Sequence, residues 1–204
     1  MTHTLHRRGS RESLKKDYAV IMLRAVGIND QDYLPKCQEF LRIASRHNPV
    51  NLASEMKGNI YEFPLEEIIA EAKGDSMCVF DNPENLTAFL RELKEADLGL
   101  SVTVSGIFEI VDECFEKAGL KHHTANFSLG IWGKTELLPS DDILEITTMC
   151  GHGMIPPSLV QAMLRAIRVG RMTPREAAKF LAPNCTCGVY NPARAAELLA
   201  KMAK

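Results

Sequence analysis

Short apolar runs alternate with amphipathic segments over the first two thirds of the chain, and this alternation limits the possible folds. Residues 18–26 form a near-continuous apolar run that ends at Gly27, which predicts a buried strand. Further strands are predicted over 77–80, 100–104 and within 123–132, with a short one at 60–63. Helices are predicted over 31–47, 65–72 and 107–118, and after the N-cap Asn82.

Strands that are separated by helices indicate an α/β fold. Residues 17–138 are therefore predicted to form a two- or three-layer α/β sandwich, with the ferredoxin-like arrangement as the leading small version. Residues 1–16 are predicted to be a basic N-terminal lead-in to this domain. We find no phosphate loop, dinucleotide fingerprint, nucleophile elbow or zinc-protease motif.

Strand signals end at Pro139, and only helical signals follow. Helices are predicted over 141–149 and 157–169, after the capping box of Thr173 and Glu176, and from Asn191 onward. Residues 139–204 are therefore predicted to be a helical module that packs on the sandwich. Because so short a segment builds only a small core, docking or a metal ion would help it to fold.

Charge is distributed unevenly along the chain. Residues 62–149 carry 18 Asp and Glu against 6 Lys and Arg, whereas residues 150–204 carry 8 basic against 2 acidic residues. Such a basic unit can attract nucleic acid, a small anion or the acidic part of the chain itself. Nucleic acid is disfavoured, because no aromatic residues are interleaved with the basic series Arg165, Arg168, Arg171 and Arg175.

The chain is expected to be cytoplasmic. Its apolar runs are too short to span a membrane, and its basic N-terminus lacks the apolar stretch of a signal peptide. The six cysteines are then expected to be reduced, so that clustered cysteines indicate metal binding or redox chemistry rather than disulfides.

The cysteines fall into two classes. Three lie within the apolar patterns of predicted helices or strands and are predicted to be core residues: Cys37, Cys78 and Cys114. The other three lie in Gly-flanked turns between helices: Cys150, Cys185 and Cys187.

The second class of cysteines is compatible with three kinds of site. Three thiolates can hold a [4Fe–4S] cluster with one iron open to substrate. With His152 they can also form a tetrahedral Cys3His zinc site. The Cys185-x-Cys187 pair could instead be a redox dithiol, with Cys150 as an independent nucleophile. The spacing matches neither a ferredoxin nor a zinc ribbon.

The leading functional hypothesis is an oxygen-sensitive iron–sulfur enzyme that performs redox or lyase chemistry on a small anionic substrate. His152 is the candidate catalytic acid/base, and Arg7, Arg8 and Arg11 are candidate anion-binding residues. One alternative is a structural zinc-binding module for protein interaction, and the other is a thiol oxidoreductase or sulfur carrier. An electron-transfer partner, a protein partner and an oligomer are compatible with these hypotheses.

Overall fold

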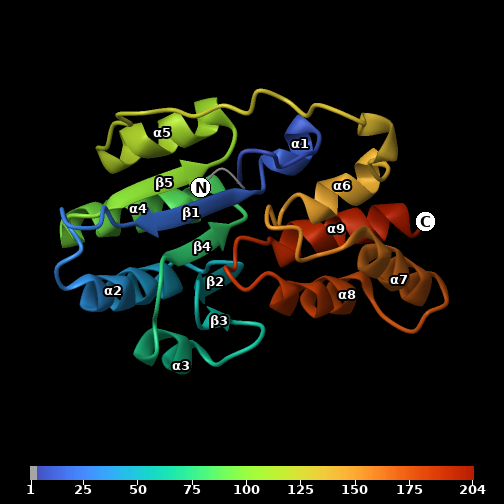
Figure 1. Ribbon diagram of the computed structural model, residues 1–204, viewed down its shortest axis with the longest axis horizontal. Helices are drawn as coiled ribbons and strands as arrows, with labels where there is room; N and C mark the ends of the chain where they lie inside the picture. Colours follow the sequence, from blue (N-terminus) through green and yellow to red (C-terminus); the bar gives the residue numbers. More distant parts are fainter. Residues whose placement is uncertain (1–3) are drawn as a thin grey trace.

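The computed structural model describes residues 4–204, and its centre is an antiparallel β-sheet (Figure 1). The strand order is β3-β2-β4-β1-β5, and each pair of neighbours is antiparallel. The strands are β1 (Tyr18–Leu23), β2 (Asn51–Ser54), β3 (Gly58–Asn59), β4 (Ser76–Phe80) and β5 (Ser101–Ser105).

Helices connect the strands in the pattern of the ferredoxin-like arrangement. One helix, α2 (Tyr33–Arg46), connects β1 to β2, and a second, α4 (Pro83–Ala96), connects β4 to β5. Without the two-residue β3, the order of the remaining strands is that of a split β-α-β-β-α-β unit. The predicted α/β sandwich is thus confirmed, and two more helices complete this part, α3 (Leu65–Ala70) and α5 (Phe108–Ala118).

The sheet is buried on both faces, and β1 shows this most directly. Its successive side chains point to opposite faces, as the pleat of a strand requires. Val20 packs with α2 and α4, whereas Ile21 packs with the helices of the C-terminal part. Both side chains are fully buried, which explains the continuous apolar run in the sequence.

The C-terminal helices form the third layer. Figure 1 shows them gathered together, away from α2 and α5. They share one core with the face of the sheet to which the Ile21 side chain points, so this layer is packed directly on the sheet. These helices are α6 (Asp141–Thr147), α7 (Pro157–Arg168), α8 (Pro174–Leu181) and α9 (Pro192–Met202), with the 3-10 turns η2 (Thr135–Leu137) and η3 (Ala182–Asn184) beside them.

Three predicted helix starts form as the sequence indicates. Asn82 accepts a hydrogen bond from the Asn85 amide at the start of α4, and Asn191 does the same for the Arg194 amide at the start of α9. Thr173 forms the complete capping box with its partner at the third helical position of α8.

Two strand predictions are wrong. Residues 123–132 form no strand, and Leu129 and Trp132 in this segment are exposed. Strand-forming side chains are stabilised when they pack on a half-buried, pleated surface. The apolar side chains of this segment have no such surface to pack on, because they are exposed. Residues 60–63, the second predicted strand, also form no strand. The strands of this region lie earlier in the chain, where β2 and β3 form a hairpin over 51–59.

The N-terminal lead-in is ordered where the structure describes it. It contains a single-turn helix, α1 (Arg11–Leu14), capped by the Ser10 hydroxyl. The first three residues of the predicted lead-in lie outside the described range. In the part that the structure covers, no helix has the length and apolar character needed to cross a membrane.

The side chain of Ile21 lies between the sheet and the C-terminal layer. We therefore expect the sheet and the C-terminal layer to unfold together. Ile21→Ala should cost about 2–5 kcal/mol of stability, because it deletes buried apolar contacts and leaves a cavity. Urea unfolding followed by pulsed hydrogen exchange should give coincident curves for peptides from β1 and α9. The exposed control Ile28→Ala should change stability by less than about 0.5 kcal/mol. Separate transitions for the two peptides would contradict a shared core.

Candidate metal centre

Two turns carry the three cysteines of the second class. The first follows α6, where the Cys150 amide donates to the carbonyl of Thr147 at 3.2 Å and the Gly153 amide donates to the Cys150 carbonyl at 3.1 Å. The second turn follows η3, where the Gly188 amide donates to the Cys185 carbonyl at 2.8 Å. The cysteine side chains of both turns lie in the core between the sheet and the C-terminal helices.

The sheet holds the second turn through buried polar side chains. The Asn59 amide group donates to the carbonyls of Ala182 and Cys185, both at 3.0 Å. The Asn51 side chain donates to the carbonyl of Tyr190 at 3.0 Å. Since both asparagines are fully buried, these bonds satisfy carbonyls that water does not reach.

Gly188 allows the second turn to approach β2 closely. Its φ of +69° lies in the left-handed region that favours glycine. A Cβ atom at this position would lie 2.4 Å from the Cβ of Ala53. Glycine is therefore required here both for the backbone angle and for the contact with the sheet.

The turns bring the three cysteines and His152 together. The Sγ atoms of Cys185 and Cys187 lie 3.8 Å apart, and Cys187 Sγ lies 3.6 Å from Nδ1 of His152. Cys150 interacts with the Cys185 side chain and with the backbone N–H groups of Met154 and His152. His152, which precedes Cys187 by 35 positions in the sequence, is thus placed beside the cysteine pair.

The three thiols are buried, which the sequence did not indicate. Cys150 and Cys185 are each 1% exposed and Cys187 is 2% exposed, whereas His152 is at the surface. A site with this burial resembles a closed structural centre more than one open to substrate.

The surroundings of the cysteines shift the pKa values of Cys150 and Cys185 in opposite directions. Contact with Cys185 lowers the pKa of Cys150 to about 6; burial opposes the shift, and the backbone N–H groups lower the pKa further. The pKa of Cys185 is raised well above its ordinary value, first by contact with Cys150 and Cys187 and then by burial. Donated N–H groups of this kind stabilise a metal-bound thiolate.

The Sγ–Sγ and Sγ–Nδ1 distances match those between ligands of one tetrahedral ion. With Zn–S near 2.3 Å and Zn–N near 2.0–2.1 Å, tetrahedral angles place two sulfurs about 3.8 Å apart and a sulfur and a nitrogen about 3.6 Å apart. In residues 4–204, no group of three or more His, Cys, Asp or Glu side chains has all its members placed to hold an ion. If one ion is bound here, ligand side chains would have to shift to complete the site.

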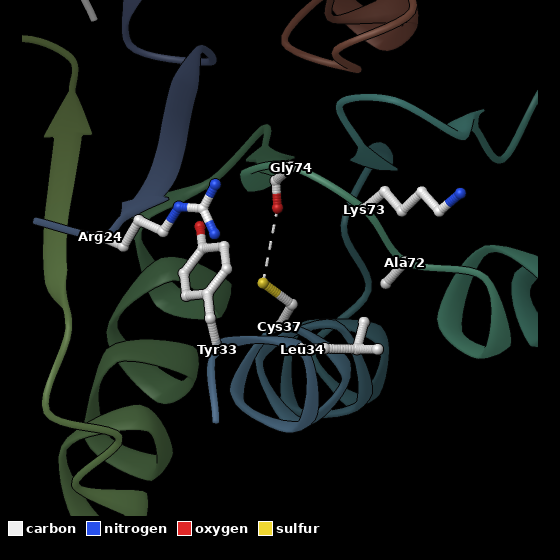
Figure 2. Close-up of a pocket in the computed structure, with 7 residues that line it drawn as sticks. All are labelled: Arg24, Tyr33, Leu34, Cys37, Ala72, Lys73 and Gly74. Carbon is white, nitrogen blue, oxygen red and sulfur yellow. Dashed lines mark hydrogen bonds between the residues drawn. The ribbon is translucent and has the colours of Figure 1, made fainter. Parts of the chain in front are cut away.

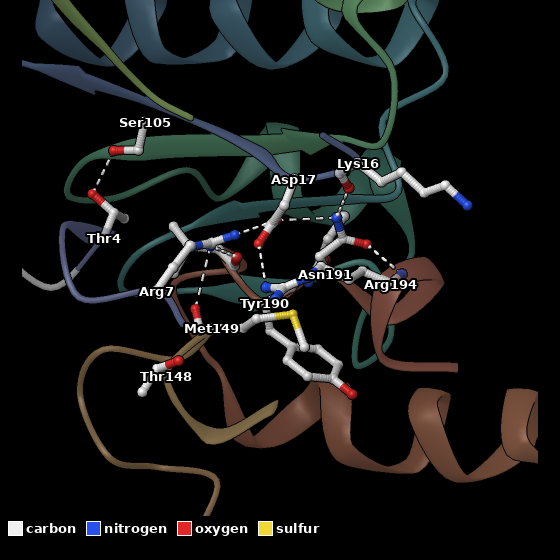
Figure 3. A network of polar contacts seen from close by, with 12 residues as sticks. Thr4, Arg7, Lys16, Asp17, Ser105, Thr148, Met149, Tyr190, Asn191 and Arg194 are labelled. Atoms are coloured by element: carbon white, nitrogen blue, oxygen red, sulfur yellow. Dashed lines mark hydrogen bonds and ion pairs between the residues drawn. The ribbon is translucent and has the colours of Figure 1, made fainter. Parts of the chain in front are cut away.

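The candidate anion-binding arginines are paired with carboxylates of the chain. Arg8 forms an ion pair with Asp141 at 2.6 Å, and Arg11 approaches Glu109 at 3.5 Å. Arg7 is buried and forms an ion pair with Asp17 (Figure 3). Their proposed role in substrate binding stays a prediction, and the guanidinium of Arg7 is already engaged within the fold.

The other three cysteines lie in the core on the opposite face of the sheet. Burial raises the pKa of each of their thiols. Cys37 also lines a pocket beside Tyr33, where its thiol donates to the Gly74 carbonyl at 3.5 Å (Figure 2). Packing explains these cysteines, as the sequence predicted.

The sequence analysis did not identify Asn51, Asn59, Asp17 and Arg194 as residues that support the site. Each forms at least one hydrogen bond to a residue more than 100 positions away, and no local pattern indicates such a bond. No protein-family model, curated protein or solved structure matches this chain. Function is therefore argued from the site itself.

Gly188→Ala should destabilise the chain more than Gly130→Ala. Both glycines have positive φ, so each substitution carries a backbone cost of about 1 kcal/mol. Only at position 188 does the new methyl group meet another atom, which adds about 1–3 kcal/mol of overpacking. Urea denaturation of both variants measures the difference. Equal losses would show that the turn does not pack on β2 as described.

Proposed function

We propose that this chain is a zinc protein in which Cys150, Cys185, Cys187 and His152 bind one structural ion. The observation that carries the proposal is the position of Cys187 Sγ, 3.8 Å from Cys185 Sγ and 3.6 Å from Nδ1 of His152. The two contacts fit neighbouring ligands of a single tetrahedral ion.

The same spacing favours one ion over the iron–sulfur cluster predicted from the sequence. In a [4Fe–4S] cluster each cysteine binds its own iron atom, and sulfides separate the irons, so the cysteine sulfurs stand well apart. The Cys185 and Cys187 sulfurs are in direct contact. The iron–sulfur prediction stays open to the metal analysis described below.

The bound ion would fasten the C-terminal helices to the sheet. Cys150 follows α6, and Cys185 and Cys187 lie between η3 and α9, so one ion would connect three helical elements. The second turn itself contacts β2 and β3.

The uneven charge fits a module that binds a protein partner, because segment 62–149 is acidic and segment 150–204 is basic. We propose that this module works in the reducing cytoplasm.

A second candidate function is thiol chemistry at Cys150. Its lowered pKa, about 6, supports a thiolate near neutral pH. Burial of the sulfur counts against direct attack on a large substrate. If thiol chemistry is the function, iodoacetamide should label Cys150 faster than Cys114 in metal-free protein, as read by mass spectrometry.

We expect the chain, purified without oxygen, to contain about one zinc ion and no inorganic sulfide. Elemental analysis and a sulfide assay measure this directly. Iron with sulfide in a brown protein would overturn the zinc proposal and support the cluster. A chain free of both metals that also fails to bind added Zn²⁺ would overturn both metal hypotheses.

Cys187→Ser should lose bound zinc, because a serine hydroxyl is a poor substitute for a thiolate ligand. Cys114→Ala, in the opposite core, should keep it. A chelator should lower the Tm of the wild-type chain, since free zinc at 100 times Kd contributes about 2.7 kcal/mol, equivalent to roughly 5–11 °C for this size. The same chelator should leave the Tm of Cys187→Ser unchanged, and an equal fall in both would contradict a structural ion at this site.

A further inference from the structure

We propose that Arg7 is a positioning residue that connects the two cysteine turns and thereby sets the metal affinity of the site. This inference rests on the proposed zinc function and adds to it a residue from the N-terminal segment. The predicted metal ligands all lie beyond residue 149, so nothing in their spacing points to this arginine.

The contacts of Arg7 reach both turns at once. Its Nη2 donates to the carbonyl of Met149 at 3.3 Å (Figure 3). The same Nη2 also donates to the carbonyl of Val189. Met149 directly precedes Cys150, and Val189 comes two residues after Cys187. One guanidinium nitrogen therefore connects the backbone beside one ligand to the backbone beside the others.

The other end of the guanidinium is fixed by a buried carboxylate. Nη1 of Arg7 is paired with Oδ1 of Asp17, and Nη1 of Arg194 donates to Oδ2 of Asp17 at 2.8 Å. The Asn191 side chain donates to Asp17 Oδ1 at 3.1 Å. Since the side chains of Arg7, Asp17 and Arg194 are at most 6% exposed, this network holds Arg7 in one position.

The backbone of the same segment adds further contacts. The Arg8 amide donates to the Thr148 hydroxyl at 3.0 Å, and the Arg8 carbonyl accepts from Arg194 Nη2 at 2.5 Å. Gly9 is required for this approach, because a Cβ atom there would lie 2.3 Å from Arg194 Nη2. The segment thus lies directly against the turn that carries Cys150.

A metal site depends on this kind of support. Ligands must be held at fixed positions to complete a tetrahedral ion, and substitution of an outer-shell partner typically weakens metal binding by about 10–100-fold. Lysine would keep the charge opposite Asp17, but its single nitrogen lacks the planar fork that lets arginine bind the carboxylate and two carbonyls together.

The test measures the zinc Kd of Arg7→Lys in the full chain by competition with a chromogenic chelator. We expect Kd to rise about 10–100-fold. Arg11→Ala is the matched control, because Arg11 lies in the same segment with its side chain exposed, and it should keep the wild-type Kd. Cobalt substitution adds a second readout, since a displaced ligand changes the visible spectrum of tetrahedral Co²⁺.

Leu86→Ala is the control for a general loss of stability. It creates a cavity in the core on the other face of the sheet, away from the cysteines of the two turns. It should lower Tm at least as much as Arg7→Lys but keep the wild-type Kd. If Arg7→Lys fails to fold, Arg7→Gln replaces it in the same assay.

Two results would overturn the inference while leaving the zinc site in place: an unchanged Kd in the Arg7 variants, or an equal rise in Leu86→Ala. A wild-type chain that binds no zinc would overturn the proposed function, and this inference with it.

Discussion

The carboxylate of Asp17 is fully buried directly before β1, and it binds side chains from two other parts of the chain. Arg7 comes from the N-terminal segment, and Arg194 and Asn191 come from the last helix. A buried charge that loses its partners costs several kcal/mol, so these elements are stable only when they are assembled together. Asn191 also caps α9, which means that the helix begins at the residue that binds the carboxylate.

Features determined by a few neighbouring residues were predicted well from the sequence. The caps at Asn82 and Thr173 depend on partners three residues away, and the apolar run from Tyr18 reflects a strand buried on both faces. The hairpin over 51–59 was missed because its buried positions include Asn51 and Asn59. A polar residue in a strand resembles a loop residue unless its distant hydrogen-bond partner is known.

The same distinction applies to the candidate site. The Gly-flanked turns identified Cys150, Cys185 and Cys187 as a separate class, because turn chemistry is local. Their burial and the distance between sulfurs depend on how the C-terminal helices pack on the sheet, which no local pattern records. These two properties are the grounds on which we propose a closed site for one ion rather than a cluster with an open iron.

The two turns are supported in different ways, and this difference bears on how an ion would be bound. The Cys185 turn is held by Asn59 and by the contact of Gly188 with the sheet. The Cys150 turn is held from the N-terminal segment, by the Arg7 side chain and the Arg8 amide, and Gly153 beside it has open space around the position of a Cβ atom. In the zinc proposal, the ligands that would have to move to complete a tetrahedral site are therefore Cys150 and His152, which both lie in the first turn. Because the Cys185 and Cys187 sulfurs already have the spacing of two neighbouring ligands, zinc binding would require only the first turn to move, which would lower its entropic cost.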